Sequence, residues 1–260
     1  MRFRGSHVGM AMAIGVLLVA ALLVGRFALT ERTGVPDITT ERVYDRTQFV
    51  AELSQAGFAL GDAAHVRIFK REHKLELWLK RADGRYALFR DYDICKFSGA
   101  LGPKLKEGDR QAPEGFYRVA SNQLNPNSRH HLSFNLGFPN AFDRQLGRTG
   151  SALMVHGGCS SVGCYAITDR SVDEVYAVVE AALSNGQDAV DVHVFPFRMT
   201  ATALAAEGGN TWAPFWRNLK AGYDLFEASG RPPKVGACRG EYRFGADAEG
   251  PECAVIAAWS

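Results

Sequence analysis

Residues 8–24 form an apolar run without a charged side chain, which divides the chain into two parts of different character. As a helix, this run spans about 25 Å, close to the hydrocarbon thickness of a bilayer. It is apolar on all sides, unlike a helix that packs one face on a globular core. No small-x-small cleavage site follows it. We therefore predict an uncleaved signal anchor or transmembrane segment in residues 1–30, which places the rest in the cell envelope, inner-membrane anchored or periplasmic. The alternatives are a cleaved signal peptide and a helix buried in the fold.

The composition of the whole chain is that of a globular protein. Its 260 residues are 47% hydrophobic and 22% charged, with a formal net charge of +2. Those fractions exclude a disordered chain and a multi-pass membrane protein. The small net charge argues against a nucleic-acid binder.

Short apolar segments separated by turn residues predict a fold that is mainly β with a few helices. Strands are predicted at residues 66–69, 75–79, 86–89, 95–100, 116–119, 151–155 and 190–196, with a sheet-like stretch at the end. Helices are predicted from Asp37 or Thr39 to Ala56, at residues 172–183 with Ser171 or Asp169 near the N-cap, and at residues 212–226. Residues 102–112 are expected to form a loop, and residues 121–142 a long surface excursion.

The chain has five cysteines, Cys95, Cys159, Cys164, Cys238 and Cys253. Export to an oxidising compartment permits disulfides, and an odd number leaves at least one thiol unpaired. Cys238 and Cys253 are the best candidate pair, because they lie close together in a glycine-rich segment. The alternative is that both are small unpaired core residues.

The candidate chemistry lies in residues 156–167. An apolar strand leads into His156, and Gly163 immediately precedes Cys164. A thiol with a pKa of about 8.5 is mostly protonated at neutral pH, so a neighbouring imidazole supplies the activation that a nucleophile needs. Backbone amides at Gly163 and Cys164 could stabilise an oxyanion. These are the parts needed for acyl transfer.

Two other interpretations of the same residues stay open on spacing alone. Cys164 can be a small buried hydrophobe. Alternatively, zinc can be bound by His156, Cys159 and Cys164, with His193 or Cys95 as the fourth ligand.

This stretch resembles the active-site signature of the L,D-transpeptidase catalytic domain, the YkuD-type family. In that family an apolar strand ends in His-Gly and is followed by Ser-x-Gly-Cys, as in His156-Gly157 and Ser161-Val162-Gly163-Cys164. Upstream, residues 112–117 (APEGFY) and 97–99 (FSG) resemble the family's turn and the strand before it. The resemblance covers residues 64–197. It implies a YkuD-like β-sandwich catalytic domain at residues 64–200, preceded by a linker and helix at 31–63 and followed by a C-terminal α/β extension at 201–260.

The chain departs from the usual family pattern at two positions. Val162 stands where the family usually has His, and Ala166 stands where it usually has Arg or Asn. The missing Arg or Asn removes the family's usual means of holding a substrate carboxylate. Together with the later segment from His193 to Arg198, these departures resemble the YafK-like branch. That branch implies an amidase-like alternative, which releases protein attached to peptidoglycan.

The resemblance also implies roles for individual residues. Cys164 is the expected nucleophile and His156 its base, while Gly163 and Ser161 are expected to stabilise the oxyanion or orient the site. Tyr165, Gly157 and His193 are candidates to line the substrate site.

The implied substrates are peptidoglycan stem peptides, attacked at diaminopimelate through a thioester on Cys164. No cofactor and no metal are expected. The expected partners are a peptidoglycan-attached envelope protein and, through the N-terminal helix, the membrane, but no nucleic acid. The alternative from another class is a non-catalytic peptidoglycan-binding or zinc-stabilised envelope module.

Overall fold

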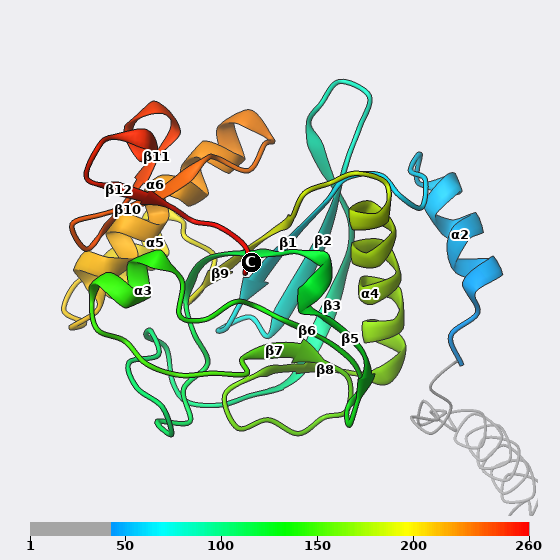
Figure 1. The fold of residues 1–260 in the computed structure, drawn as a ribbon, viewed down its shortest axis with the longest axis horizontal. Helices are drawn as coiled ribbons and strands as arrows, with labels where there is room; N and C mark the ends of the chain where they lie inside the picture. Colours follow the sequence, from blue (N-terminus) through cyan, green and yellow to red (C-terminus); the bar gives the residue numbers. More distant parts are fainter. Residues whose placement is uncertain (1–42, 260) are drawn as a thin grey trace, which may run out of the picture. The chain divides into compact units, whose positions relative to one another are not determined.

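The computed structural model describes residues 43–259, which contain two β-sheets and several helices (Figure 1). A nine-stranded sheet has the order β4-β9-β1-β2-β3-β8-β7-β6-β5, and a three-stranded sheet has the order β11-β10-β12. The strands of the large sheet are β1 (Ala64–Phe69), β2 (Lys74–Lys80), β3 (Tyr86–Phe97), β4 (Gly115–Val119), β5 (Leu124–Ser128), β6 (His131–Asn135), β7 (Met154–His156), β8 (Tyr165–Ile167) and β9 (Val190–Phe195). The prediction of a mainly β fold with a few helices is confirmed.

The predicted membrane segment lies outside the described residues. Within residues 43–259, no helix is long and apolar enough to cross a membrane.

The long strand β3 joins two halves of the large sheet, so the two layers of the expected sandwich are continuous. On one side β3 pairs with β2, and on the other its end pairs with β8. The sheet curves at β3 into half a barrel. Apolar residues of both halves therefore meet in one core.

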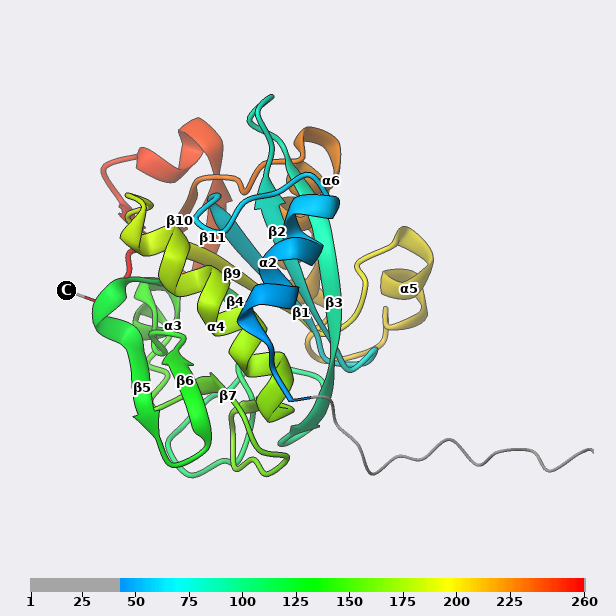
Figure 2. The ribbon, with the colours of Figure 1, turned by 90° about the vertical axis from the view of Figure 1, so that its right-hand side faces the viewer.

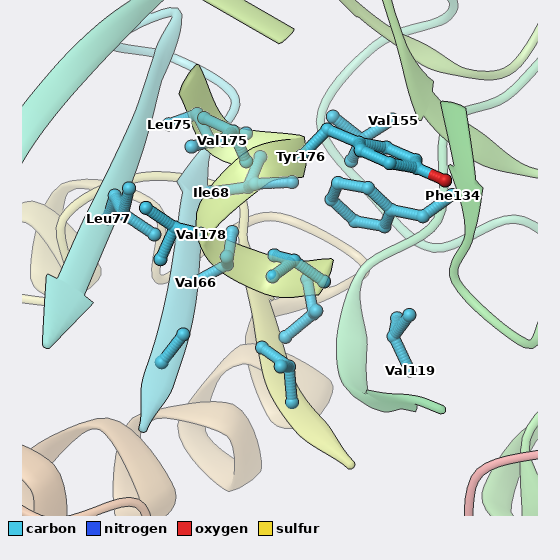
Figure 3. Close-up of a cluster of buried hydrophobic side chains, with 14 of the residues drawn as sticks. Val66, Ile68, Leu75, Leu77, Val119, Phe134, Val155, Val175, Tyr176 and Val178 are labelled. Carbon is cyan, nitrogen blue, oxygen red and sulfur yellow. The ribbon is translucent and has the colours of Figure 1, made fainter. Parts of the chain in front are cut away.

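That core is filled by side chains of α4 (Asp169–Ser184). Val175, Tyr176 and Val178 of this helix lie between β1 and β2 on one side and Phe134 and Val155 on the other (Figure 3). In β2, alternation turns Leu75, Leu77 and Leu79 into this core, where all three are fully buried, as their spacing predicts.

Helix α2 (Arg46–Gln55) lies on the same side of the sheet as α4 (Figure 2). Arg90 of β3 joins the two helices, because it contacts Glu52 of α2 at 2.7 Å and Glu174 of α4 at 2.5 Å. The prediction that α2 begins at Asp37 or Thr39 is wrong. Its N-cap is Asp45, whose carboxylate accepts from the backbone amides of the first turn.

The opposite side of the sheet carries a second core, formed with the C-terminal residues. Its elements are α3 (Ala141–Gln145), α5 (Ala201–Ala206), α6 (Ala213–Ser229), β10 (Val235–Cys238), β11 (Glu241–Phe244) and β12 (Cys253–Val255), with the 3-10 helices η1 (Ser121–Gln123) and η2 (Gly245–Glu249) in the connections. Phe69 and Phe116 of the large sheet share this core with Trp216 and Tyr242 from beyond residue 200. The domain boundaries at residues 30, 63 and 200 stay predictions.

Cys238 and Cys253 form a disulfide that joins β10 and β12. The predicted pairing of these two cysteines is therefore confirmed.

Three sequence expectations need correction. Residues 121–142 are not a surface excursion, because β5 and β6 add a hairpin to the large sheet and Phe134, Leu136, Phe138 and Phe142 are buried. The strand predicted at 95–100 is instead the end of β3. Helix α4 begins at Asp169, earlier than the predicted residue 172, and its N-cap is Thr168, next to the Asp169 that the sequence placed near the N-cap.

Candidate active site

Cys164 lies in the bend immediately before β8, and His156 is the last residue of β7. These two strands are neighbours and run parallel, with His156 in register with Ala166. Residues two apart in a strand share a face, so Cys164 lies on the same face as Ala166 and therefore as His156. Cys164 lies one residue before β8, so extension of the strand spacing by that residue puts the two Cα atoms about 8 Å apart, a separation that the two side chains can bridge.

The hydrogen bond of His156 defines which of its nitrogens can act as a base. Nδ1 lies 2.6 Å from the carbonyl oxygen of Gly157. A carbonyl only accepts, so Nδ1 carries the proton and donates it, which leaves the lone pair on Nε2. Nε2 is therefore the atom able to take the thiol proton of Cys164.

The environment of His156 favours the neutral imidazole. Its side chain is buried, and the ring of His130 stacks on it with centroids 4.5 Å apart. Burial lowers the pKa of His156 and the neighbouring His130 lowers it further, while the bond to Gly157 opposes them. His156 is thus ready to accept a proton at neutral pH.

The thiol of Cys164 is also neutral at rest. Burial raises its pKa, although the Met154 amide and the Lys104 ammonium lower it in part. Its Sγ lies 3.5 Å from the carbonyl oxygen of Ala152, to which the thiol donates. The resting pair is therefore a thiol and an imidazole rather than an ion pair. The proton must move when Sγ turns to attack.

Ser161 holds the turn that presents Cys164. Its Oγ donates to the carbonyl of Cys164 at 2.7 Å and accepts from the Gly163 amide at 3.2 Å. Ser98, which follows β3, donates to the Ser161 carbonyl at 2.9 Å. Gly163 has φ +125°, a conformation that favours glycine. The Gly163 amide can donate to an oxyanion only after it releases its hydrogen bond to Oγ of Ser161.

Gly157 is required by close packing. A Cβ at this position would lie 2.6 Å from Oδ1 of Asp169 and 2.8 Å from the carbonyl oxygen of His130. Asp169 in turn accepts from the Gly158 amide at 2.7 Å. It thereby joins the loop after His156 to the first turn of α4, a role that its position near a predicted N-cap did not indicate.

The side chains of the two remaining predicted residues, Tyr165 and His193, make their contacts away from the thiol. Tyr165 is fully buried and donates to the Pro113 carbonyl at 2.6 Å, so it packs under the strand. His193 of β9 is buried between the rings of His65 and Phe116. It lines a separate cavity of about 280 Å³, whose lining does not include Cys164 or His156.

The zinc interpretation is wrong for the set of ligands proposed. Cys95 and Cys159 form a disulfide with each other, so neither supplies a thiolate. This bond ties the loop before Cys164 to β3. Cys164 is the cysteine that remains free in the described chain.

A buried network not anticipated from the sequence supports the loop beside the site. Glu114 accepts from Nζ of Lys70 at 3.0 Å, from the Gly102 amide at 2.6 Å and from the Trp216 indole at 2.9 Å. Lys70 also donates to the carbonyls of Gly102 and Ala112 at 2.9 Å. Both ends of residues 102–112 are thereby fixed to β1 and α6. The sequence feature that could have revealed this network is Glu114, a carboxylate within an otherwise apolar turn.

Comparison with known proteins identifies the relatives of this chain. It is 45% identical over 183 residues to "Putative L,D-transpeptidase YafK" of Escherichia coli K12, which covers 70% of this chain and 74% of the relative. The protein of the same name from Escherichia coli O157:H7 gives the same values. The chain belongs to the L,D-transpeptidase family, in its YafK branch. No family model matches the sequence.

Solved structures similar to this L,D-transpeptidase family member are more distant. One is the K307A mutant of Pgp2 from Campylobacter jejuni, described as a helical cell shape determining protein, with a TM-score of 0.43 and 20% identity. The match covers 70% of this chain and 65% of that chain, which is just under two thirds. Bd1075 of Bdellovibrio bacteriovorus has a TM-score of 0.39 and 14% identity, over 76% of this chain and 94% of that chain.

The two departures from the usual family pattern have different surroundings in this branch member. Val162 is 76% exposed at the tip of the turn before the thiol. Ala166 is fully buried in β8, and its carbonyl oxygen lies 3.3 Å from Sγ of Cys95, a disulfide sulfur that has no hydrogen to donate. An exposed apolar residue and a buried methyl group therefore replace two polar side chains.

Proposed function

We propose that this protein is a cysteine acyl-transfer enzyme that acts on peptidoglycan stem peptides and attacks an amide at diaminopimelate through a thioester on Cys164. The observation that carries the proposal is the placement of a free thiol and an imidazole with an available Nε2 lone pair at adjacent strands, with His156 on β7 and Cys164 immediately before β8. Membership of the YafK branch supplies the substrate class.

The first half of the reaction forms the thioester. Nε2 of His156 takes the thiol proton as Sγ of Cys164 attacks the amide carbonyl, which gives a tetrahedral oxyanion. The C–N bond then breaks, and the imidazolium returns the proton to the departing amine. The Gly157 carbonyl stabilises the imidazolium, because it accepts from Nδ1.

The second half of the reaction releases the acyl group. An acceptor amine or water loses a proton to Nε2 and attacks the thioester carbonyl. The C–S bond breaks, and the thiolate recovers a proton from the imidazolium. An amine acceptor gives a crosslink or an attached envelope protein, whereas water gives hydrolysis.

Hydrolysis that releases a peptidoglycan-bound protein is the second candidate function. It is favoured by Val162 and Ala166, which stand where the transpeptidase pattern usually has His and Arg or Asn. The two candidates use the same thioester and differ only in the acceptor. An envelope location, through an N-terminal anchor in residues 8–24, fits either one.

The test incubates the full-length protein with defined muropeptides and reads the products by mass spectrometry. One substrate carries a free terminal D-amino acid, and another carries a lysyl peptide on diaminopimelate. We expect turnover by the unmodified protein, loss of turnover in Cys164→Ala and His156→Ala, and retained turnover in the control His131→Ala. Full turnover in Cys164→Ala would refute the proposal.

A further inference from the structure

A groove of about 700 Å³ lies beside the turn that carries the nucleophile. Ser161 and Val162, the residues shortly before Cys164, form one part of its lining. Lys96, at the end of β3, and Arg110, in the loop after it, contribute two cationic side chains. Asp109 is the acidic side chain in this lining.

Strand register places Lys96 on the face of the sheet that carries the reaction. Lys96 of β3 is in register with Ala166 of β8, which is in register with His156 of β7. Side chains directly opposite each other on paired strands point to the same face. A β-bulge between Ile94 and Lys96 sets this register. A cation from the neighbouring strand therefore stands opposite Ala166, where the usual family pattern has a polar side chain on β8 itself.

The charges of the groove are not balanced internally. Both oxygens of Asp109 are occupied, because they accept from Nζ of Lys104 at 2.5 Å and from the amides of Leu105, Lys106 and Gln111 at 2.9–3.0 Å. Within residues 43–259, neither Lys96 nor Arg110 has an acidic partner within ion-pair distance. The groove therefore presents two uncompensated positive charges beside the thiol.

The backbone conformation of Arg110 indicates that the surrounding loop holds this residue in place. Arg110 has φ +54°, in the left-handed region that non-glycine residues seldom adopt. Asp109, the residue before Arg110, accepts from the amide of Gln111, the residue after it, and from the amide of Lys106 earlier in the loop. Such a conformation costs about 1 kcal/mol and persists where surrounding contacts impose it. Here those contacts hold Arg110 at the groove.

We propose that Lys96 and Arg110 form a carboxylate-binding subsite for the diaminopimelate residue whose amide Cys164 attacks; this inference rests on the proposed function. Diaminopimelate carries a free carboxylate at its far centre, six carbon–carbon bonds or about 7 Å from the carbonyl under attack. Lys96 is in register with Ala166, and Cys164 lies one residue before β8, so their Cα atoms are diagonal neighbours about 7–8 Å apart. The flexible stem of Lys96 lets its ammonium meet a carboxylate at the distance that diaminopimelate sets from the thiol. A carboxylate held there by Lys96 and Arg110 fixes the carbonyl at the thiol.

Binding to the full-length Cys164→Ala protein tests this subsite without turnover. One probe is a tetrapeptide muropeptide with the free carboxylate, and the other is the same muropeptide amidated at that group. We expect the free acid to bind about tenfold more tightly, as for a charge-assisted hydrogen bond. Adding Lys96→Met or Arg110→Gln should remove most of this preference, and Lys96→Arg should retain it. Lys106→Met, which changes an exposed lysine outside the groove, is the matched control and should change nothing.

Kinetics with Cys164 intact separate this subsite from the proposed function. We expect Lys96→Met to raise KM for the free acid with kcat little changed, and to leave the amidated substrate unaffected. Turnover of both substrates with equal binding by all variants would overturn the subsite and leave the proposed function standing. A preference in binding that Lys96→Met removes, without turnover of any muropeptide, would support the subsite and overturn the proposed reaction.

Discussion

Replacement of Glu114 by alanine tests whether the buried network beside the candidate active site stabilises the fold. Glu114 and Lys70 are both fully buried, and their ion pair has an Nζ–Oε1 distance of 3.0 Å. Burial lowers the pKa of Lys70, while Glu114 opposes that shift and favours the charged form. Without Glu114, the ammonium keeps only the carbonyls of Gly102 and Ala112 as partners.

The expected cost follows from the loss of one member of a buried pair. Removing one partner of a buried ion pair typically costs about 3–5 kcal/mol, because the other charge is left uncompensated. The amide of Gly102 and the indole of Trp216 also lose their acceptor in Glu114→Ala. For a folded unit of this size, 1 kcal/mol corresponds to about 2–4 °C in Tm. We therefore expect Tm to fall by about 6–20 °C.

Thermal unfolding followed by circular dichroism measures this change, with a surface ion pair as the control. Lys220 and Asp224 lie four residues apart on α6, and the Asp224 side chain is 54% exposed. Asp224→Ala should change the free energy of unfolding by only about 0.5 kcal/mol. The double variant Lys70→Met with Glu114→Gln should recover part of the loss, because no buried charge remains. A Tm for Glu114→Ala equal to that of Asp224→Ala, or a double variant no more stable than Glu114→Ala, would refute the reasoning.

Three further predictions concern the site and its loop. Burial holds the pKa of His156 below its ordinary value of 6.5. In a pH–rate profile, we therefore expect kcat/KM to fall on the acid side only below pH 6.5. A fall that begins above pH 6.5 would contradict the lowered pKa. His130→Ala removes the stacked ring that helps to bury His156 and to lower its pKa, so this variant should raise that pKa and move the acid limb to higher pH. In the control, His131→Ala, the imidazole that is lost contacts Asp173 at 2.8 Å, and the acid limb should not move. Replacing Cys95 and Cys159 by serine removes a disulfide between residues 64 apart in the sequence, which should lower the free energy of unfolding by about 2–4 kcal/mol. Urea titration measures this change, and an unchanged midpoint would show that this disulfide adds no stability.

Periodicity and turn chemistry predicted the parts of the fold that depend on local sequence. The alternation of Leu75, Leu77 and Leu79 identified β2, because one face of that strand is buried along its whole length. Asn185 and Gly186 marked the end of α4, where Asn185 is the C-cap and Gly186 has φ +99°. Both features follow from neighbouring residues alone.

The hairpin of β5 and β6 was missed because its polar residues are typical of a surface loop. Asn125 and Ser128 belong to the edge strand β5, where both residues are half-buried. Burial of Phe134 and Phe138 depends on contacts with α4 and β7, far away in the sequence. Composition over a short window therefore favoured a loop where tertiary packing makes a strand.

The site shows the same division between local and long-range information. Cys164 and His156 were predicted as the candidate pair because a glycine before a cysteine and a strand that ends in histidine are local signals. Lys96 gave no such signal: it is an exposed lysine separated from Cys164 by more than sixty residues of sequence. Its relation to Ala166 exists only through the pairing of β3 with β8, and the bulge after Ile94 decides whether Lys96 or its neighbour stands opposite Ala166. A shift by one residue would turn Lys96 to the other face of the sheet. A missing polar residue in a family pattern should therefore be sought first on the strand that pairs with the gap, where a side chain can reach the same space from a different part of the sequence.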